Sequence, residues 1–170
     1  MSGEGNQPAH RAAREPIHRH AIVVREDALD ENGHVNNVRF VQWMQDAAME
    51  HSDRGGCSRL TKENGAIWVA RSHAIEYLRP AFLDDRITVL TWVCNLRRVR
   101  SLRKYRFFRD ADGALLARGE TNWVFVDMQS GRPRNIPDAV AQTFALVPPE
   151  REPPSGGAAA VAERRCVLQS

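Results

Sequence analysis

A single long helical pattern among strand-like runs constrains the fold of this chain most. Over residues 38–53, apolar side chains recur at three- and four-residue spacing, as a helix with one buried face requires. They are Val38, Val41, Met44, Ala47 and Ala48, widened by Phe40 and Trp43. One strand-like run precedes the helix at residues 17–25, and four follow at residues 66–78, 86–96, 101–109 and 114–127. The sequence therefore predicts an α+β fold, with one long helix enclosed by an antiparallel sheet of about five strands.

The connecting and terminal segments set the expected boundaries. Residues 57–64 indicate a polar connection with room for one short turn, residues 110–113 a hairpin turn, and residues 137–144 a short last helix. The first 15 residues hold almost no large apolar side chain, and residues 148–157 are rich in Pro and Gly. We therefore expect a disordered segment over residues 1–15, one domain over residues 16–147 and a flexible tail over residues 148–170.

The run at residues 87–94 is apolar on both alternating faces. One helix covers only one face of a sheet, and an apolar face left in water exceeds what soluble monomers usually tolerate. We therefore expect a homo-oligomer, either a dimer or a tetramer.

Composition limits the remaining classes. The chain has 170 residues, 42% of them hydrophobic, and a net charge of +3. No apolar run is long enough to span a membrane, and the N-terminus lacks the apolar core of a secretory signal, so a cytoplasmic protein without membrane association is expected. The three cysteines show no paired spacing. His18 and His20 share one face without further ligands, which favours a solvated or interface pair over a metal site. We expect neither metal nor cofactor.

Residues 30–37 concentrate polar groups immediately before the helix, in the order Asp-Glu-Asn-Gly-His-Val-Asn-Asn. Gly33 permits a positive φ and a close backbone approach, and Asn36 or Asn37 can cap the helix. A carbonyl placed here would meet helix N–H donors and the Asp30 carboxylate together, an arrangement suited to acyl chemistry.

The string from Asp30 through Trp43 resembles the signature of hotdog-fold thioesterases, in particular the 4-hydroxybenzoyl-CoA thioesterase-like and long-chain acyl-CoA thioesterase branch. The spacing of Asp30, Asn32 and His34 also resembles acyl-ACP thioesterases. A second match is the Tyr-x-Arg-Pro-Ala turn that begins at Tyr77. The sequence departs from the family pattern at Ala28, where a second Asp is common, and at Phe40, where Tyr is usual.

The resemblance implies hydrolysis of acyl-CoA or acyl-ACP thioesters, with Asp30 as general base or nucleophile. Asn32 would orient the acyl group, and His34 would assist the base. Gly33 and Asn37 would contact the substrate. Ser72 and His73 lie on the strand that, in this fold, approaches the active site of the second subunit.

Seven basic residues fall within residues 97–109 without an acidic neighbour before Asp110. We take Arg97, Arg98 and Arg100 as candidates for binding coenzyme A phosphates or an acidic carrier protein. An Arg-rich edge strand that resists aggregation is the structural alternative. The low net charge and sparse aromatic residues argue against a nucleic-acid partner.

Two other functions remain open on sequence grounds. A hotdog hydratase or dehydratase carries His five residues after Asp, whereas His34 follows Asp30 by four. A non-catalytic acyl-CoA-binding module would use the same groove.

Overall fold

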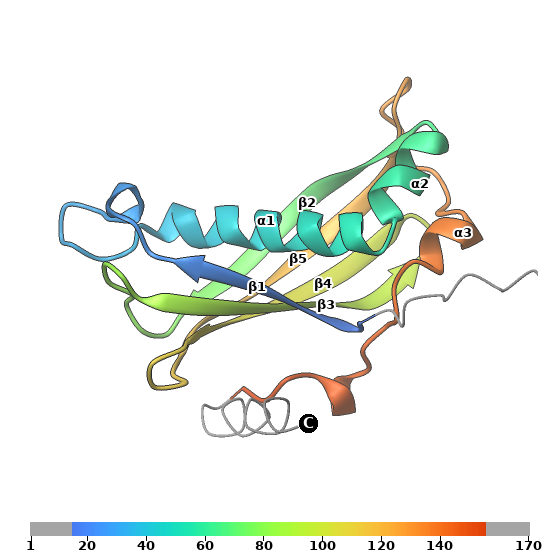
Figure 1. Ribbon diagram of the computed structural model, residues 1–170. Helices are drawn as coiled ribbons and strands as arrows, with labels where there is room; N and C mark the ends of the chain where they lie inside the picture. Colours follow the sequence, from blue (N-terminus) through green and yellow to red (C-terminus); the bar gives the residue numbers. More distant parts are fainter. Residues whose placement is uncertain (1–14, 156–170) are drawn as a thin grey trace, which may run out of the picture.

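The computed structural model describes residues 15–155. One antiparallel sheet of five strands, in the order β1-β3-β4-β5-β2, lies against a single long helix, α1 (Figure 1). The strands are β1 (Ile17–Val23), β2 (Ala66–Tyr77), β3 (Arg86–Arg97), β4 (Arg100–Arg109) and β5 (Leu115–Asp127), and α1 spans Asn37–Arg54. The predicted α+β fold and its strand positions are confirmed. None of the helices within the described residues is long and apolar enough to cross a membrane.

The face of α1 that packs on the sheet is formed by Phe40, Met44, Ala47 and Ala48, all buried. The prediction for Val38 was wrong, because its side chain is 71% exposed. The Phe40 ring fixes the helix phase through edge-to-face contacts with Trp43, Tyr77 and Phe107, at centroid distances of 5.2–5.5 Å. Val38 lies about 200° around the helix from Phe40 and therefore points to solvent.

Three further segments differ from, or refine, the sequence prediction. Residues 57–64 form a helix of about two turns, α2 (Cys57–Glu63), rather than a polar connection. Gly56 leads into it at φ +77°, and Cys57 and Thr61 are buried. The last helix, α3 (Asp138–Ala141), is shorter than predicted. Short 3-10 turns occur at Glu26–Ala28 and Pro149–Arg151.

Part of the outer face of the sheet, opposite α1, is covered by the C-terminal segment of the same chain. Val147 is 2% exposed, and its N–H donates to the carbonyl of Val93 at 2.9 Å. Its side chain packs in a buried cluster with residues of three strands, namely Leu90, Trp92, Phe108 and Leu115. Farther along, Glu152 pairs with Lys104 at 2.7 Å.

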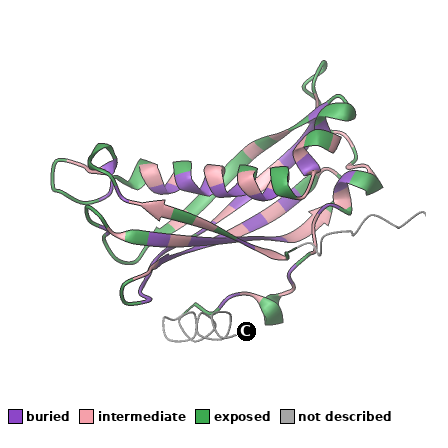
Figure 2. Ribbon diagram, in the orientation of Figure 1, coloured by how far each residue is buried: buried purple, intermediate pink, exposed green. Residues whose placement is uncertain are grey.

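Two expectations change as a result. Within the expected tail, Glu152 pairs with Lys104 of the sheet and Pro153 is buried, so the packed part of the chain extends beyond residue 147. The remainder of that tail and residues 1–14 lie outside the described residues. The chain itself covers the apolar residues Leu90 and Trp92 on the second face of β3, so these residues do not by themselves require another subunit. The most exposed apolar strand is instead β2 at the edge of the sheet (Figure 2), where Ile67 and Val69 are 41% and 43% exposed.

Candidate functional site

The loop before α1 is built around the Asp30 carboxylate. Its Oδ1 accepts the backbone N–H of Asn32 at 2.8 Å and that of His34 at 3.1 Å. Gly33 adopts φ +76°, as predicted, and donates its N–H to the carbonyl of Asp30. No residue of the described chain donates a hydrogen bond to Oδ2 of Asp30. One oxygen therefore holds the loop while the other is free to meet a ligand.

The loop is joined to α1 and to the end of β2. Asn36 caps the helix through Oδ1, which accepts the N–H of Val38 at 3.0 Å, so one of the two predicted caps is confirmed. The carbonyl of Asn37 accepts the Tyr77 hydroxyl at 3.0 Å. His34 is exposed and lies edge-to-face with Phe82 at 5.2 Å. Asp30, Asn32, Gly33, His34 and Asn37 are thus gathered in one loop and the first turn of α1.

Ser72 and His73 do not point the same way. Nδ1 of His73 lies 2.9 Å from Oγ1 of the buried Thr121, whereas Ser72 accepts from Asn122 at 3.2 Å. Since successive side chains of a strand alternate, only one of the two can face the helix side of the sheet. His73 is that residue, because Ile75, two positions on, packs in the core with α1.

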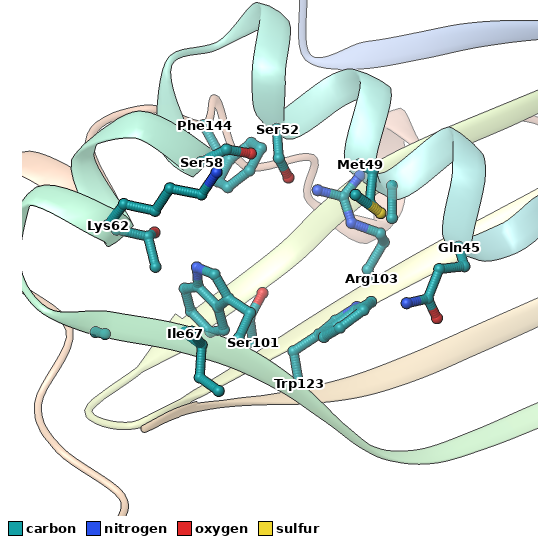
Figure 3. A pocket seen from close by; sticks show the side chains of 14 residues that line it. Gln45, Met49, Ser52, Ser58, Lys62, Ile67, Ser101, Arg103, Trp123 and Phe144 are labelled. Atoms are coloured by element: carbon teal, nitrogen blue, oxygen red, sulfur yellow. The ribbon is translucent and has the colours of Figure 1, made fainter. Parts of the chain in front are cut away.

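A cavity of about 280 Å³ opens between the second half of α1, α2 and the sheet (Figure 3). Its walls come from four kinds of element: Ala48, Met49 and Ser52 from α1, Ser58, Thr61 and Lys62 from α2, Ala66, Ile67, Trp68, Ser101, Arg103 and Trp123 from the strands, and Phe144 from the segment after α3, with Gln45 at one end. This cavity is not predictable from the sequence, because its residues are scattered along the chain. The one sequence feature that could have indicated the cavity is the presence of Ser101, Trp68 and Trp123 at strand positions where small or aliphatic apolar side chains would be expected.

Arg103, on the sheet wall of the cavity, is 3% exposed. Its Nη1 donates to Nδ1 of His51 at 3.0 Å and to Oγ1 of Thr91 at 3.2 Å. The guanidinium also lies over the Phe144 ring, 5.2 Å from its centroid. Burial, reinforced by the Arg103 charge, lowers the pKa of His51 to about 3. His51 is therefore neutral near pH 7 and serves as a hydrogen-bond acceptor.

The histidine pair on β1 is not solvated. His18 is 2% exposed and stacks on His51 with ring centroids 5.3 Å apart, while His20 is half-buried and bonds to Glu50. Of the two alternatives that the sequence favoured, a solvated or an interface pair, the solvated one is wrong for His18. Among residues 15–155, no group of three His, Cys, Asp or Glu side chains could hold a metal ion.

The basic run divides according to strand geometry. Arg97, Arg98 and Arg100 are exposed at the β3–β4 turn, and we call them the basic hairpin. Arg98 has φ +44°, a backbone conformation that residues other than glycine rarely adopt. Its carbonyl accepts the N–H of Ile136 at 2.7 Å. Arg103 instead faces the cavity, and Arg106 stacks on Trp92 at the outer face. The seven residues do not form one patch.

A long helix along one face of a five-stranded antiparallel sheet is the hotdog fold, and solved hotdog structures superpose on this one. A 1,4-dihydroxy-2-naphthoyl-CoA thioesterase from Synechocystis gives a TM-score of 0.67 at 19% identity, covering 75% of this chain and 93% of its own. An acyl-ACP thioesterase from Bacteroides thetaiotaomicron gives 0.69 at 20% identity, covering 82% and 58%.

The sequence comparisons define the family. The long-chain acyl-CoA thioesterase FadM of Escherichia coli K12 is 23% identical over 109 residues, which is 64% of this chain and 83% of FadM. The model of the thioesterase-like superfamily matches residues 23–144. The chain belongs to the thioesterase-like superfamily and is a thioester hydrolase.

Proposed function

We propose that the protein hydrolyses acyl thioesters of coenzyme A or acyl carrier protein, with Asp30 as the catalytic carboxylate. The observation that carries this proposal is that the two carboxylate oxygens of Asp30 differ in their bonding. Oδ1 accepts two backbone N–H groups of the loop, whereas Oδ2 accepts no hydrogen bond from the described residues. The fixed oxygen orients the carboxylate before substrate arrives. The free oxygen can take a proton from water or attack the thioester carbonyl directly.

Neighbouring groups have supporting roles in this proposal. Gly33 has no side chain and no atom within contact distance of the position a Cβ would occupy, so a thioester can approach the backbone there. Asn32 and His34 are exposed, and their backbone N–H groups bond to the Asp30 carboxylate. In this proposal their side chains orient the acyl carbonyl or the attacking water. Asn37 opens the first turn of α1, whose N-terminal N–H groups favour developing negative charge.

The reactive loop precedes α1, whereas the cavity lies against the second half of this helix. Gln45, the cavity residue nearest to the loop along the helix, is eight positions from Asn37, or about 12 Å, and Ser52 is fifteen positions away, or about 22 Å. β2 spans the same interval, because it begins at Ala66 beside the cavity and ends at Tyr77, which bonds to Asn37. A single short acyl thioester therefore cannot easily use both places within one subunit.

We accordingly infer a homodimer in which two β2 edges pair antiparallel about a two-fold axis. Such pairing puts the end of one β2 opposite the start of the other, and so brings Asp30 of one subunit to the cavity of its partner. The length of β2 and its exposed Ile67 and Val69 support this interface, since long apolar edge strands are prone to pair. His73, on the helix side of β2, would then border the shared site.

The basic hairpin lies at the cavity end of the sheet, since Ser101 of the cavity wall directly follows Arg100. Its three exposed guanidinium groups suit the phosphates of coenzyme A or the acidic surface of a carrier protein. The positive φ of Arg98 belongs to the two-residue turn between β3 and β4, which holds the three side chains at the end of the hairpin.

Release of free thiol from a panel of acyl-CoA and acyl-ACP substrates tests the proposal. We expect turnover on at least one carrier, and the ratio between carriers identifies the natural one. Binding of acyl-CoA without thiol release would instead indicate a binding module, and hydration of an enoyl thioester without thiol release would indicate a hydratase.

A further inference from the structure

Arg103 is a buried cation whose charge is not balanced by a carboxylate in the described structure. Its two hydrogen bonds go to His51 and Thr91, both uncharged. The nearby groups capable of negative charge are the phenol of Tyr105 and the thiols of Cys57 and Cys94. Burial raises the pKa of the Tyr105 phenol and raises the pKa of the Cys94 thiol to about 11, so both are uncharged near pH 7. Because burying an unpaired charge is costly, such a residue calls for an anion or for a function.

The cavity is where an anion can reach this guanidinium. Figure 3 shows Arg103 rising from the sheet toward Ser52 and Met49 of α1, with Lys62 extending over the same space from α2. Nη1 makes both hydrogen bonds of the guanidinium, which leaves Nε and Nη2 without an acceptor among residues 15–155. A planar guanidinium with two free donors on neighbouring nitrogens matches the two oxygens of a carboxylate.

The cavity wall has the composition of an acceptor-binding site. Its lining includes the two cations Arg103 and Lys62, and neither Asp nor Glu is among the residues that line it. The indole Nε1 of Trp68 is buried there without a hydrogen-bond acceptor in the described chain. Ala48, Met49, Ile67 and Phe144 supply apolar surface between these polar groups. An apolar stem that ends in an acceptor fits this wall better than a wholly apolar chain.

We propose that the cavity selects acyl groups that carry a carboxylate at the end remote from the thioester, with Arg103 as the specificity-determining residue. This inference rests on the proposed thioesterase function and names its substrate class. A terminal carboxylate gains charge-assisted hydrogen bonds to Arg103. A terminal methyl group would displace water from the guanidinium without forming a hydrogen bond to it. This desolvation costs free energy, so acyl chains that end in methyl bind less well.

The test compares acyl-CoA pairs of equal length, ending in methyl or carboxylate, over chains of about four to twelve carbons. In the wild-type protein, kcat/KM should favour the carboxylate member at the best length by at least about tenfold. Arg103→Gln should lower kcat/KM for that member by at least about thirtyfold and leave the methyl member within about threefold. Arg103→Lys should recover part of the preference.

Arg106→Gln is the matched control, since Arg106 is a buried arginine on the same strand but faces away from the cavity. It should change both substrates by the same factor. Equal losses on both substrates in Arg103→Gln, or a wild-type preference for the methyl member, would overturn the inference and assign Arg103 a structural role.

A binding measurement on the wild-type protein covers the case in which Arg103→Gln does not fold. Free dicarboxylates should raise the melting temperature more than monocarboxylates of equal length, and the absence of any difference would also overturn the inference. Thiol release without discrimination would leave the proposed thioesterase function standing. Discrimination in binding without thiol release on any carrier would contradict the proposed function while supporting the specificity of the cavity.

Discussion

Replacing Val147 by Ala should destabilise the protein by about 2 kcal/mol. The side chain is 2% exposed and packs against the outer face of the sheet. Two buried methyl groups are worth about 1.6 kcal/mol in transfer free energy, and the space left behind adds a few tenths. For a chain of this size the melting temperature should fall by about 4–8 °C. Equilibrium unfolding in urea, followed by circular dichroism, measures the free-energy change.

Leu146→Ala is the matched control, because the neighbouring side chain is 46% exposed and belongs to the same segment. It should change the free energy of unfolding by less than about 0.5 kcal/mol. If the two variants proved equally stable, the C-terminal segment would not be packed on the sheet in solution. The conclusion that this segment covers part of the outer face of the sheet would then be wrong.

Three further predictions concern substrate, pH and assembly. Replacing the three arginines of the basic hairpin by Gln should raise KM for acyl-CoA more than it lowers kcat, and the effect should shrink on thioesters without the nucleotide; equal losses on both would mark the hairpin as structural. The lowered pKa of His51 means that the unfolded chain binds more protons between about pH 6.5 and pH 3, so this contribution to stability is lost as pH falls through that window. His51→Asn should therefore flatten the acid side of a melting-temperature profile, and an unchanged slope would contradict the assignment. Mixing Asp30→Asn with the cavity-blocking variant Ser58→Trp should restore up to about a quarter of wild-type activity if each site uses both subunits, and none if each subunit acts alone.

Most of the fold was predictable because its signals are local. The apolar spacing in α1, the alternating strands and the Asp-Ala-Asp-Gly turn each depend on a few neighbouring residues. The Asp30 loop was predictable for the same reason, since Gly33 and Asn36 perform the backbone roles that their chemistry suits.

The features that sequence analysis missed depend on distant contacts. Val147 is one apolar residue in a Pro-rich segment, and nothing in its surroundings shows that it will cover Trp92. Helix α2 is too short to be stable alone and depends on burial of Cys57 and Thr61. Arg103 lies in a run of basic residues, and strand alternation places its side chain on the other face of the sheet from Lys104 and Arg106. Only the fold shows that its side of the sheet faces a cavity.

Turnover by Asp30→Asn, measured as thiol release on the best acyl thioester, tests the central claim most directly. The Asn side chain retains an oxygen for the N–H groups of Asn32 and His34, so the loop should keep its shape while the negative charge is lost. We expect kcat to fall at least about a hundredfold with little change in melting temperature, whereas the adjacent exposed variant Glu31→Gln keeps near-normal turnover. Near-normal turnover in Asp30→Asn, or an equal loss in Glu31→Gln, would contradict the assignment of Asp30 as the catalytic carboxylate.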